Sequence, residues 1–293
     1  LEFRRVLFRS QAGFAHSYRF DDYEVCRGMS ALVKVQAADG LPRARLPALI
    51  GAFTLLLIVG PFIGLGFATH WNDFHFAPGD VGSIAVSLGY SMIALMLIIA
   101  LGTPLAWWLA RQSFRGKWVL EAIILLALLT PPLAMGILLT TLYGPYGPVG
   151  GLVTHAGIEL TNSTAAFIIA QFYGALPYYV VAARAAFEGV PRELEHIALT
   201  LGKSPWQTFW LVSMPLARLG LAAGIALAWV RAMGEFGIVL ILAYYPQGIP
   251  VKLWVNLQDI GLSAVYPLLW VFFLVAMPLP LILGLASRRQ RVF

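Results

Sequence analysis

Residues 188–215 read EGVPRELEHIALTLGKSPWQTFWLVSMP, a polar segment between two strongly apolar stretches of the chain. A charged side chain at the centre of a bilayer costs about 2.5 kcal/mol or more, and this segment holds several within a few turns. We therefore expect it to lie outside a bilayer. Its alternation of charged and apolar residues indicates a docking surface for a soluble partner.

The composition is that of a membrane protein rather than a soluble domain. Hydrophobic residues make up 59% of the 293 residues and charged residues 12%, whereas soluble domains average about 25% charged. A helix needs about 20 residues to cross a hydrocarbon core of ~30 Å. Six apolar stretches meet that length, and we place them at 46–69, 85–110, 119–142, 164–183, 216–243 and 267–286.

Basic residues are distributed unevenly among the segments that connect these spans. The loops at 70–84 and 143–163 contain no Lys or Arg, and 244–266 contains only Lys252. The other connections and the tail are basic, and cytoplasmic loops carry such an excess. This pattern predicts cytoplasmic termini and a cytoplasmic 184–215 loop. It also explains the net charge of +6 without a nucleic-acid partner, because the charges are split among loops.

The first residues, LEFRRVLFRS, are expected to be foreign to the protein. Back-translation of residues 1–10 matches ten successive codons of a common sequencing adapter, which indicates an assembly artefact. Residues 11–28 are polar and aromatic without periodicity, so we interpret 1–28 as a non-native leader and Met29 as the start. A signal peptide is excluded because no apolar run follows the early arginines.

The middle of the polar segment predicts a short amphipathic helix. Leu194, Ile197, Ala198 and Leu201 are spaced i, i+3, i+4, i+7 and share one face. Glycine follows at 202, where a left-handed residue ends a helix at little cost. Glu193 and His196 lie off the apolar stripe.

A second short helix is expected directly after this glycine. Ser204 suits its N-cap and Pro205 its first turn. Trp206, Phe209 and Trp210 would give it an aromatic side. Two short helices at an angle form a compact knob. From the residues alone, an ordinary interfacial loop with an amphipathic helix is as good an interpretation.

From about residue 80 to 290 the chain resembles the permease subunits of ABC importers for molybdate, tungstate and sulfate. The polar segment is similar to the cytoplasmic coupling loop of such permeases, the EAA loop. The other motifs follow in the order and spacing of that family: SLGYSMIAL, PLAWWLARQSFRGKWVLEAIILLALLTPPLAMGILL, GPYGPVG and RAMGEFGIVLILA.

The resemblance implies an all-α integral membrane protein of six transmembrane helices, with the type I ABC-importer permease fold and cytoplasmic coupling helices. Residues 29–83 would form the tail, first span and outer loop, and 84–293 the permease core with its coupling loop at 184–215. Such a subunit lies in the inner (plasma) membrane and is expected to form a homodimer. Its implied partners are cytoplasmic ATP-binding-cassette ATPase subunits, which bind the ATP, and an extracytoplasmic substrate-binding protein. This chain itself is expected to hold no cofactor.

The implied activity is ATP-driven import of a tetrahedral oxyanion by alternating access. Molybdate or tungstate is the first expectation and sulfate or thiosulfate the alternative. The rival from another class is a stand-alone secondary transporter or channel. Such folds often carry inverted repeats and ionisable relays at the midplane, and apart from one Arg–Glu pair the sequence shows neither.

The loop departs from the family pattern at its first residues. Counted back from Gly202, the usual Glu-Ala-Ala triplet is His196-Ile197-Ala198 here, and Glu195 stands one position earlier, where it could supply the acidic contact. The residues expected to couple to the ATPase are Glu195, His196, Ala198, Gly202, Pro205 and Trp206.

Two features inside the spans are candidates for the substrate pathway. Arg231 and Glu235 are spaced i, i+4 in the fifth span, and a charge there is a functional candidate by default. The pair either satisfies itself and holds helices together, or lets Arg231 meet a passing oxyanion. Thr130 begins a helix break, Thr-Pro-Pro, that either kinks the third span or lines a polar route. Further possible wall residues are Ser87, Ser91, Thr103, Thr140, Thr141 and Gln171.

Enzyme chemistry finds no support in the sequence. Gly202-Lys203-Ser204 mimics the end of a phosphate-binding loop, but Ile197 stands where that motif needs a glycine. The five histidines show no metal-ligand spacing, and a single cysteine, Cys26, excludes an intrachain disulfide. No Ser/His/Asp set or carboxylate pair suggests a catalytic site, so we expect a transport subunit without enzymatic activity or bound metal.

Overall fold

The computed structural model describes residues 45–289, and every regular element in that range is a helix. The expected artefact at 1–10, the leader to residue 28 and Met29 lie outside the described residues. The chain divides into two compact units between residues 67 and 68, and the described part of the first unit is the helix α3 (Arg45–Ala68) without its last residue. With Pro61 inside it, α3 remains continuous and is long enough to span a bilayer.

Within residues 45–289, five helices are long and apolar enough to cross a membrane, or six when one sharply bent pair counts as a single span. The prediction of six spans in an all-α membrane fold is confirmed in this form. Besides α3, they are α4 (Asp80–Arg111), α8 (Thr164–Glu188), the helix from Pro205 to Met233, the helix from Leu262 to Leu285, and the bent pair.

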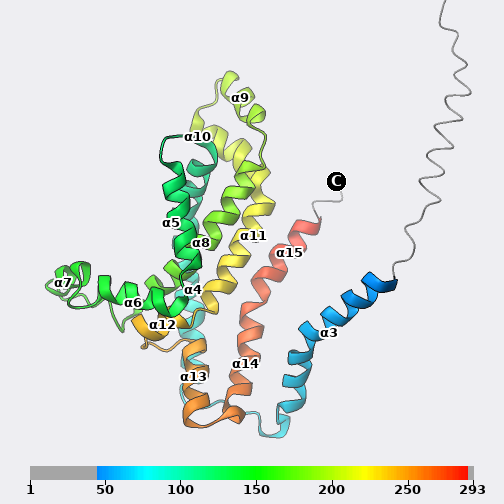
Figure 1. The fold of residues 1–293 in the computed structure, drawn as a ribbon, viewed down its shortest axis with the longest axis vertical. Coiled ribbons are helices and arrows are strands. Elements are labelled where there is room, and N and C mark those ends of the chain that lie inside the picture. The colour runs from blue at the N-terminus through cyan, green and yellow to red at the C-terminus, as the bar shows by residue number, and fades with distance from the viewer. Residues whose placement is uncertain (1–44, 290–293) are drawn as a thin grey trace, which may run out of the picture. The chain divides into compact units, whose positions relative to one another are not determined.

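Helix α8 forms the centre of the second unit, with α4 and α11 (Met214–Met233) packed against it (Figure 1). Small residues allow the backbones to approach closely, as is usual between membrane helices. A Cβ at Gly102 of α4 would lie 2.7 Å from the ring of Tyr179 on α8. A Cβ at Gly220 of α11 would meet Ala186 of α8. Tyr179 is itself buried in the main hydrophobic core.

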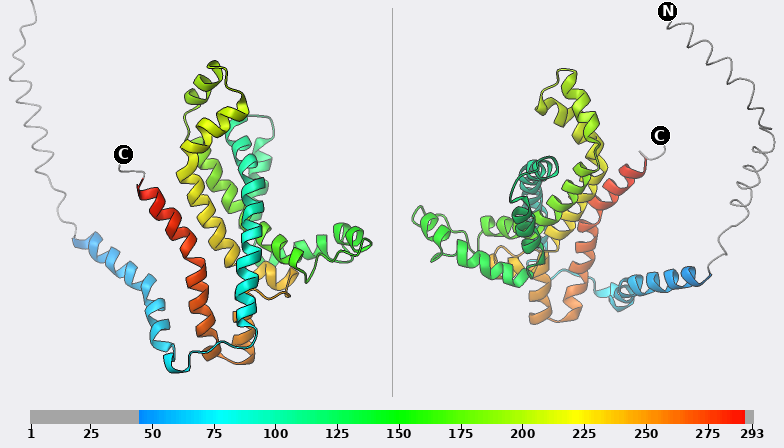
Figure 2. Two further views of the ribbon diagram at one scale, coloured as in Figure 1. Left: turned by 180° about the vertical axis from the view of Figure 1, so that it is seen from behind. Right: turned by 45° about the horizontal axis from the view of Figure 1, so that its top comes forward.

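The third predicted span, 119–142, is not one straight helix. It consists of α5 (Lys117–Leu129) and α6 (Pro132–Tyr143), which are bent by 113° at the break. Pro131 and Pro132 have no amide hydrogen to continue α5, and Pro132 suits the first turn of a new helix. Helices α6 and α7 (Pro148–Thr154) project to one side of the helical bundle (Figure 2).

The fifth predicted span, 216–243, also differs from expectation at both ends. Its helix begins at α10 (Pro205–Thr208) and continues through the π-helical η2 (Phe209–Ser213) into α11. The N–H of Met214 bonds the Phe209 carbonyl, five residues back, and this wider turn accommodates Pro215, which has no amide hydrogen to offer. The helix ends at Met233, and α12 (Gly237–Leu242) follows as a separate short helix.

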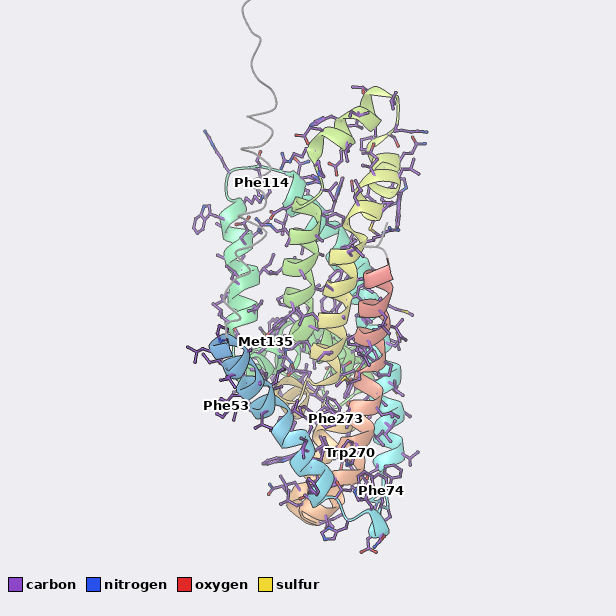
Figure 3. The ribbon with its side chains drawn as sticks, turned by 90° about the vertical axis from the view of Figure 1, so that its right-hand side faces the viewer. Phe53, Phe74, Phe114, Met135, Trp270 and Phe273 are labelled. Atoms are coloured by element: carbon purple, nitrogen blue, oxygen red, sulfur yellow. The ribbon has the colours of Figure 1, made fainter. Side chains whose placement is uncertain are left out.

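The two ends of the bundle are marked by different elements (Figures 1 and 3). The helix α9 (Arg192–Thr200) and Phe114 lie at one end, which we call the α9 end. Phe74 and Trp270 lie at the opposite end, and Met135 of α6 lies between the two. The remaining elements are η1 (Trp71–Asp73), α13 (Ile249–Asp259), α14 (Leu262–Ala276) and α15 (Pro278–Arg289).

Candidate functional site

The predicted loop helix exists as α9 and ends at Gly202 as its sequence indicates. The N–H of Lys203 donates to the Ala198 carbonyl at 3.1 Å, and the N–H of Gly202 to the Leu199 carbonyl at 3.0 Å. These two bonds form a Schellman motif, in which the residue after the helix is left-handed. Gly202 has φ +81°, a conformation that residues with a Cβ rarely adopt.

The next helix begins at the predicted cap but is not a separate short helix. The hydroxyl of Ser204 accepts from the Gln207 N–H at 3.2 Å, and the Gln207 side chain accepts from the Ser204 N–H at 3.0 Å. This capping box, with Pro205 in the first turn, fixes the start of α10. Because α10 runs on into α11, the expected knob of two short helices is instead α9 followed by the first turn of a spanning helix. We call residues 191–206 the knob.

Three of the four stripe residues of α9 face away from the rest of the chain, and the fourth, Ala198, is half-buried. Leu194, Ile197 and Leu201 are 42%, 54% and 76% exposed. His196 and Trp206 are exposed as well, and no residue between 191 and 207 is buried. Exposed apolar residues gathered on a segment that carries charges are typical of an interaction surface. The knob is therefore a candidate docking surface.

Glu195 points in the other direction, toward the bundle. Its Oε1 accepts from Nε and a terminal guanidinium nitrogen of Arg111 at 3.0 and 2.7 Å, and from the Ser213 hydroxyl at 2.6 Å. The side chains of Arg111 and Glu195 are 9% and 13% exposed. A contact between Glu195 and an ATPase remains a prediction, and the structure gives its carboxylate partners within this chain. Sequence reasoning missed Ser213, and it assigned Arg111 only to orientation.

Arg231 lies in the last turn of the spanning helix and forms an ion pair with Glu235, which lies just beyond that helix. Glu235 follows the helix end at Met233, its side chain is fully buried, and its Oε2 is paired with the Arg231 guanidinium. Its Oε1 accepts from the Ile238 N–H at 2.9 Å and so caps α12. The Arg231 side chain is 23% exposed and its guanidinium lies 5.5 Å from the centroid of the Tyr178 ring.

The residues that follow α11 pack closely against α6. Helix α11 ends at Met233. A Cβ at Gly237 would lie 2.7 Å from Cβ of Pro132 at the start of α6. The helix break at Thr130 and the ion pair at Glu235 thus belong to neighbouring elements, α6 and α12, that pack together. Thr130 itself donates its hydroxyl to the Leu126 carbonyl at 2.6 Å.

Most of the expected wall residues have partners inside this one chain instead. Gln171 donates to Ser91 at 2.7 Å and to the Ala232 carbonyl at 3.1 Å, which joins α8 to α4 and α11. Thr103 lies 2.7 Å from the Tyr179 hydroxyl, and the Ser87 hydroxyl accepts from the Ile249 N–H. Buried hydroxyls and amides satisfy one another in this way. Ser87, Ser91, Thr103 and Gln171 therefore join helices within the core.

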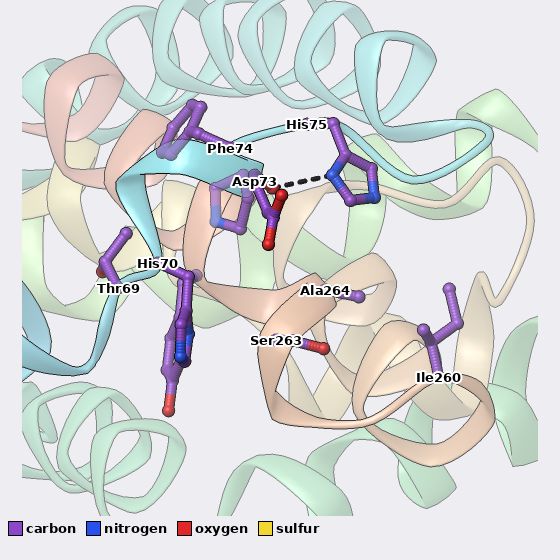
Figure 4. A pocket seen from close by; sticks show the side chains of 10 residues that line it. Thr69, His70, Asp73, Phe74, His75, Ile260, Ser263 and Ala264 are labelled. Atoms are coloured by element: carbon purple, nitrogen blue, oxygen red, sulfur yellow. Dashed lines mark hydrogen bonds between the residues drawn. The ribbon is translucent and has the colours of Figure 1, made fainter.

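The end opposite α9 contains a cavity of about 380 Å³, lined by Thr69, His70, Asp73, Phe74, His75, Ile260, Ser263, Ala264, Tyr266 and Pro267. Nδ1 of His75 donates to the Asp73 carbonyl at 2.7 Å (Figure 4). Among residues 45–289, no group of three or more His, Cys, Asp or Glu is arranged to hold a metal ion.

Comparison with known proteins places these features in a family. The family model described as the binding-protein-dependent transport system inner membrane component matches residues 102–292. The chain belongs to this family. The match includes the knob, the ion pair and the α5–α6 break. Membership makes the chain a multi-pass inner-membrane transport subunit, not an enzyme, and sets aside the stand-alone transporter or channel.

Individual relatives and one solved structure agree with the family. A probable molybdenum ABC transporter permease protein of Haloferax volcanii is 42% identical over 63% of this chain and 67% of its own length. The molybdenum transport system permease protein ModB of Azotobacter vinelandii is 35% identical over 56% of this chain and 73% of its own. A chain of a bacterial alginate ABC transporter complex superposes with a TM-score of 0.67 at 17% identity, over 83% of this chain and 93% of that one. This likeness concerns the fold, and the predicted ABC-permease fold is confirmed.

Proposed function

We propose that this chain is the membrane subunit of an ATP-driven importer of molybdate, with tungstate as a second substrate. The observation that carries the substrate is its 42% identity with a relative named for molybdenum transport. Molybdate and tungstate are tetrahedral dianions of nearly equal size, so a route that passes one is expected to pass the other. Sulfate, the alternative, is disfavoured because the relatives described above are named for molybdenum.

The knob is proposed to dock into a groove of an ATP-binding-cassette subunit on the cytoplasmic side. Support comes from its exposed apolar stripe and Trp206, since buried aromatic and aliphatic anchors carry much of the affinity at interfaces. His196, Ala198, Gly202 and Pro205 belong to the same surface or hold its shape. The chain has no phosphate-binding loop, so the energy of ATP has to enter through such a contact.

The pathway is proposed to form between two copies of the chain. Helix α6 exposes Leu133, Ile137 and Leu138, and irregular backbone follows it. Irregular backbone at membrane depth is tolerated only where protein or a water-filled cavity covers it. A second copy packed against the α6 side supplies that cover, while a substrate-binding protein delivers the anion at the end opposite α9.

Arg231 is proposed to contact the anion on its way. Glu235 and the Tyr178 ring hold the guanidinium, and its side chain stays partly exposed. Thr130 and Glu235 shape the same region through the packing of α6 on α12. A guanidinium already paired with a carboxylate binds a dianion weakly enough to release it, which a transport route requires.

Reconstitution tests this function directly. The chain and its ATPase are reconstituted together in proteoliposomes. ATP is supplied on the side of the ATPase and the substrate-binding protein on the opposite side, and transport of molybdate, tungstate and sulfate across the membrane is measured. We expect molybdate uptake that depends on ATP and on both partners, competition by tungstate, and weak competition by sulfate. Uptake without any ATPase would contradict the proposal, and sulfate uptake that molybdate does not inhibit would reassign the substrate.

A further inference from the structure

The carboxylate of Glu195 joins three separate elements of the chain. Arg111 is the last residue of α4, Glu195 lies on α9, and Ser213 is the last residue of η2. Arg111 and Ser213 donate to the same oxygen, Oε1, at 2.6–3.0 Å. We call these three residues the clamp. Charge-assisted bonds of this kind are stronger than neutral ones.

Two further bonds hold the same junction. Arg111 also donates to the Val190 carbonyl at 3.2 Å, and Arg192 of α9 donates to the Ala110 carbonyl of α4 at 3.2 Å. The end of α4 and the beginning of α9 are therefore tied in both directions, by an arginine from each side. Val190 is the last buried residue before the knob, so these bonds begin where the chain leaves the core.

Apolar packing does not provide an alternative hold on α9. No residue of α9 is buried, and the chain returns to the core only at Thr208. Packing of apolar side chains usually fixes the position of a helix, but here the inward face offers Glu195 and the small Ala198. The orientation of the knob relative to the spans consequently depends on the clamp.

The third member of the clamp lies where the spanning helix is irregular. Ser213 is fully buried and ends the π-helical turn between α10 and α11. Such turns occur often at functional sites because they interrupt the regular ladder of a helix. Because Glu195 is bonded to Arg111 and Ser213, a displacement of α9 would pull on the end of α4 and on the start of α11. Both of these helices pack on α8.

We infer that Arg111, Glu195 and Ser213 position the knob and transmit its movement to the spanning helices α4 and α11, with Glu195 acting inside the chain rather than on the ATPase. This inference rests on the proposed function. It makes the clamp a set of positioning residues: removing it should leave the exposed docking surface intact and break the link between ATP hydrolysis and transport.

The test uses the complete complex of permease, ATPase and binding protein in proteoliposomes. Arg111→Ala and Glu195→Ala should still co-purify with the ATPase, while stimulation of ATP hydrolysis by molybdate-loaded binding protein falls about tenfold, as expected for coupled interactions of ~1.4 kcal/mol. The charge exchange Arg111→Glu with Glu195→Arg should recover several-fold of that loss. Molybdate transported per ATP should follow the same order.

Arg184→Ala is the matched control. Arg184 lies at the end of α8 and pairs with Glu121 and Glu188, without contacting α9. We expect its stimulation and transport ratio to equal those of the unaltered protein. Ser213→Ala removes one donor and keeps the ion pair, so it should show a smaller loss, about two- to threefold.

Three outcomes would overturn the inference. They are unchanged coupling in Arg111→Ala and Glu195→Ala, a charge exchange no better than the single variants, or loss of ATPase co-purification in the Glu195 variants alone, which would place Glu195 in the docking contact. If Arg111→Ala does not accumulate in the membrane, Arg111→Lys and Ser213→Ala decide, since both keep the charges. Failure of the proposed function looks different, because the unaltered complex would then show no molybdate-dependent stimulation.

Discussion

Glu235 lies directly over Gly174 of α8, so closely that a Cβ at residue 174 would be 2.8 Å from its Oε2. The same Oε2 is paired with Arg231, and the other oxygen, Oε1, accepts from the Ile238 N–H. A buried carboxylate retains its charge only where such partners replace water. Gly174 therefore provides the space that allows a charge to sit between α8, α11 and α12.

Gly174→Ala is predicted to destabilise the protein by about 1–3 kcal/mol, the range typical of overpacked interiors. The added methyl group has to displace Glu235, and Glu235 is fixed at both oxygens, so one of its bonds must lengthen. Thermal unfolding in detergent measures the effect. Gly89→Ala on α4 is the control, because a Cβ there meets nothing within 4 Å. Equal unfolding temperatures for both variants would show that the carboxylate moves freely.

A double variant distinguishes the two interpretations of Arg231, a structural ion pair and a contact with the transported anion. Arg231→Met alone leaves a buried charge unpaired and should destabilise by about 3–5 kcal/mol. Arg231→Met with Glu235→Gln removes both charges and keeps an acceptor for Ile238, so its stability should be near normal. If Arg231 contacts the anion, molybdate transport by the stable double variant falls about ten- to hundredfold, as for a lost bond to a charged group. Normal transport would leave the pair a structural role only.

Local features were predictable from the sequence because their causes are local. The glycine at 202, the cap at Ser204 and the apolar stripe of α9 each depend on neighbours within one or two turns. The partner of Glu195 was not predictable in this way. Arg111 is 84 positions away, and an arginine after a span is explained equally well by the positive-inside rule. Only the packing of α4 beside α9 selects it.

For the spans, composition was predictable from the sequence but the direction of the helices was not. Hydropathy identifies 119–142 and 216–243 as apolar, and they are. The break at Thr130 was predicted from its two prolines, but hydropathy does not report direction, so neither the 113° size of that bend nor the end of α11 at Met233 was predicted. Proline and glycine marked the places, yet such residues also occur within continuous membrane helices, as Pro61 in α3 and Pro104 in α4 do.

The proposed orientation places the knob inside the cell and the loop with η1 outside. Cysteines at Lys203 and Asn72, each introduced after Cys26→Ser, report the two sides. Lys203 is preferred to Ser204 because Ser204 caps α10. A membrane-impermeant maleimide applied to intact cells should label position 72 and reach position 203 only after the membrane is opened. Labelling of position 203 from outside would reverse the topology and remove the knob from the ATPase.

Gly202 gives the sharpest test of the knob. Two substitutions at this position distinguish the effect of backbone strain from the effect of adding a side chain. Its φ of +81° is strained for residues with a Cβ, by about 1–2 kcal/mol, and least for Asn, whereas a β-branched residue is a clear outlier there. A Cβ at this position meets nothing within 4 Å, so any effect comes from backbone strain rather than a clash. Gly202→Val should unwind the Schellman turn and so distort the docking surface itself, while the spans still insert.

We expect Gly202→Val to lose most co-purification with the ATPase and most binding-protein-stimulated ATP hydrolysis, and Gly202→Asn to keep the larger part of both. Membrane levels of the two variants serve as the control for insertion. Equal and normal coupling in both would mean that the geometry of residues 191–206 does not matter to the ATPase, and the proposed docking surface would be wrong. Equal loss in both would instead mean that coupling tolerates no side chain at position 202. The ATPase would then contact the chain closely at that residue.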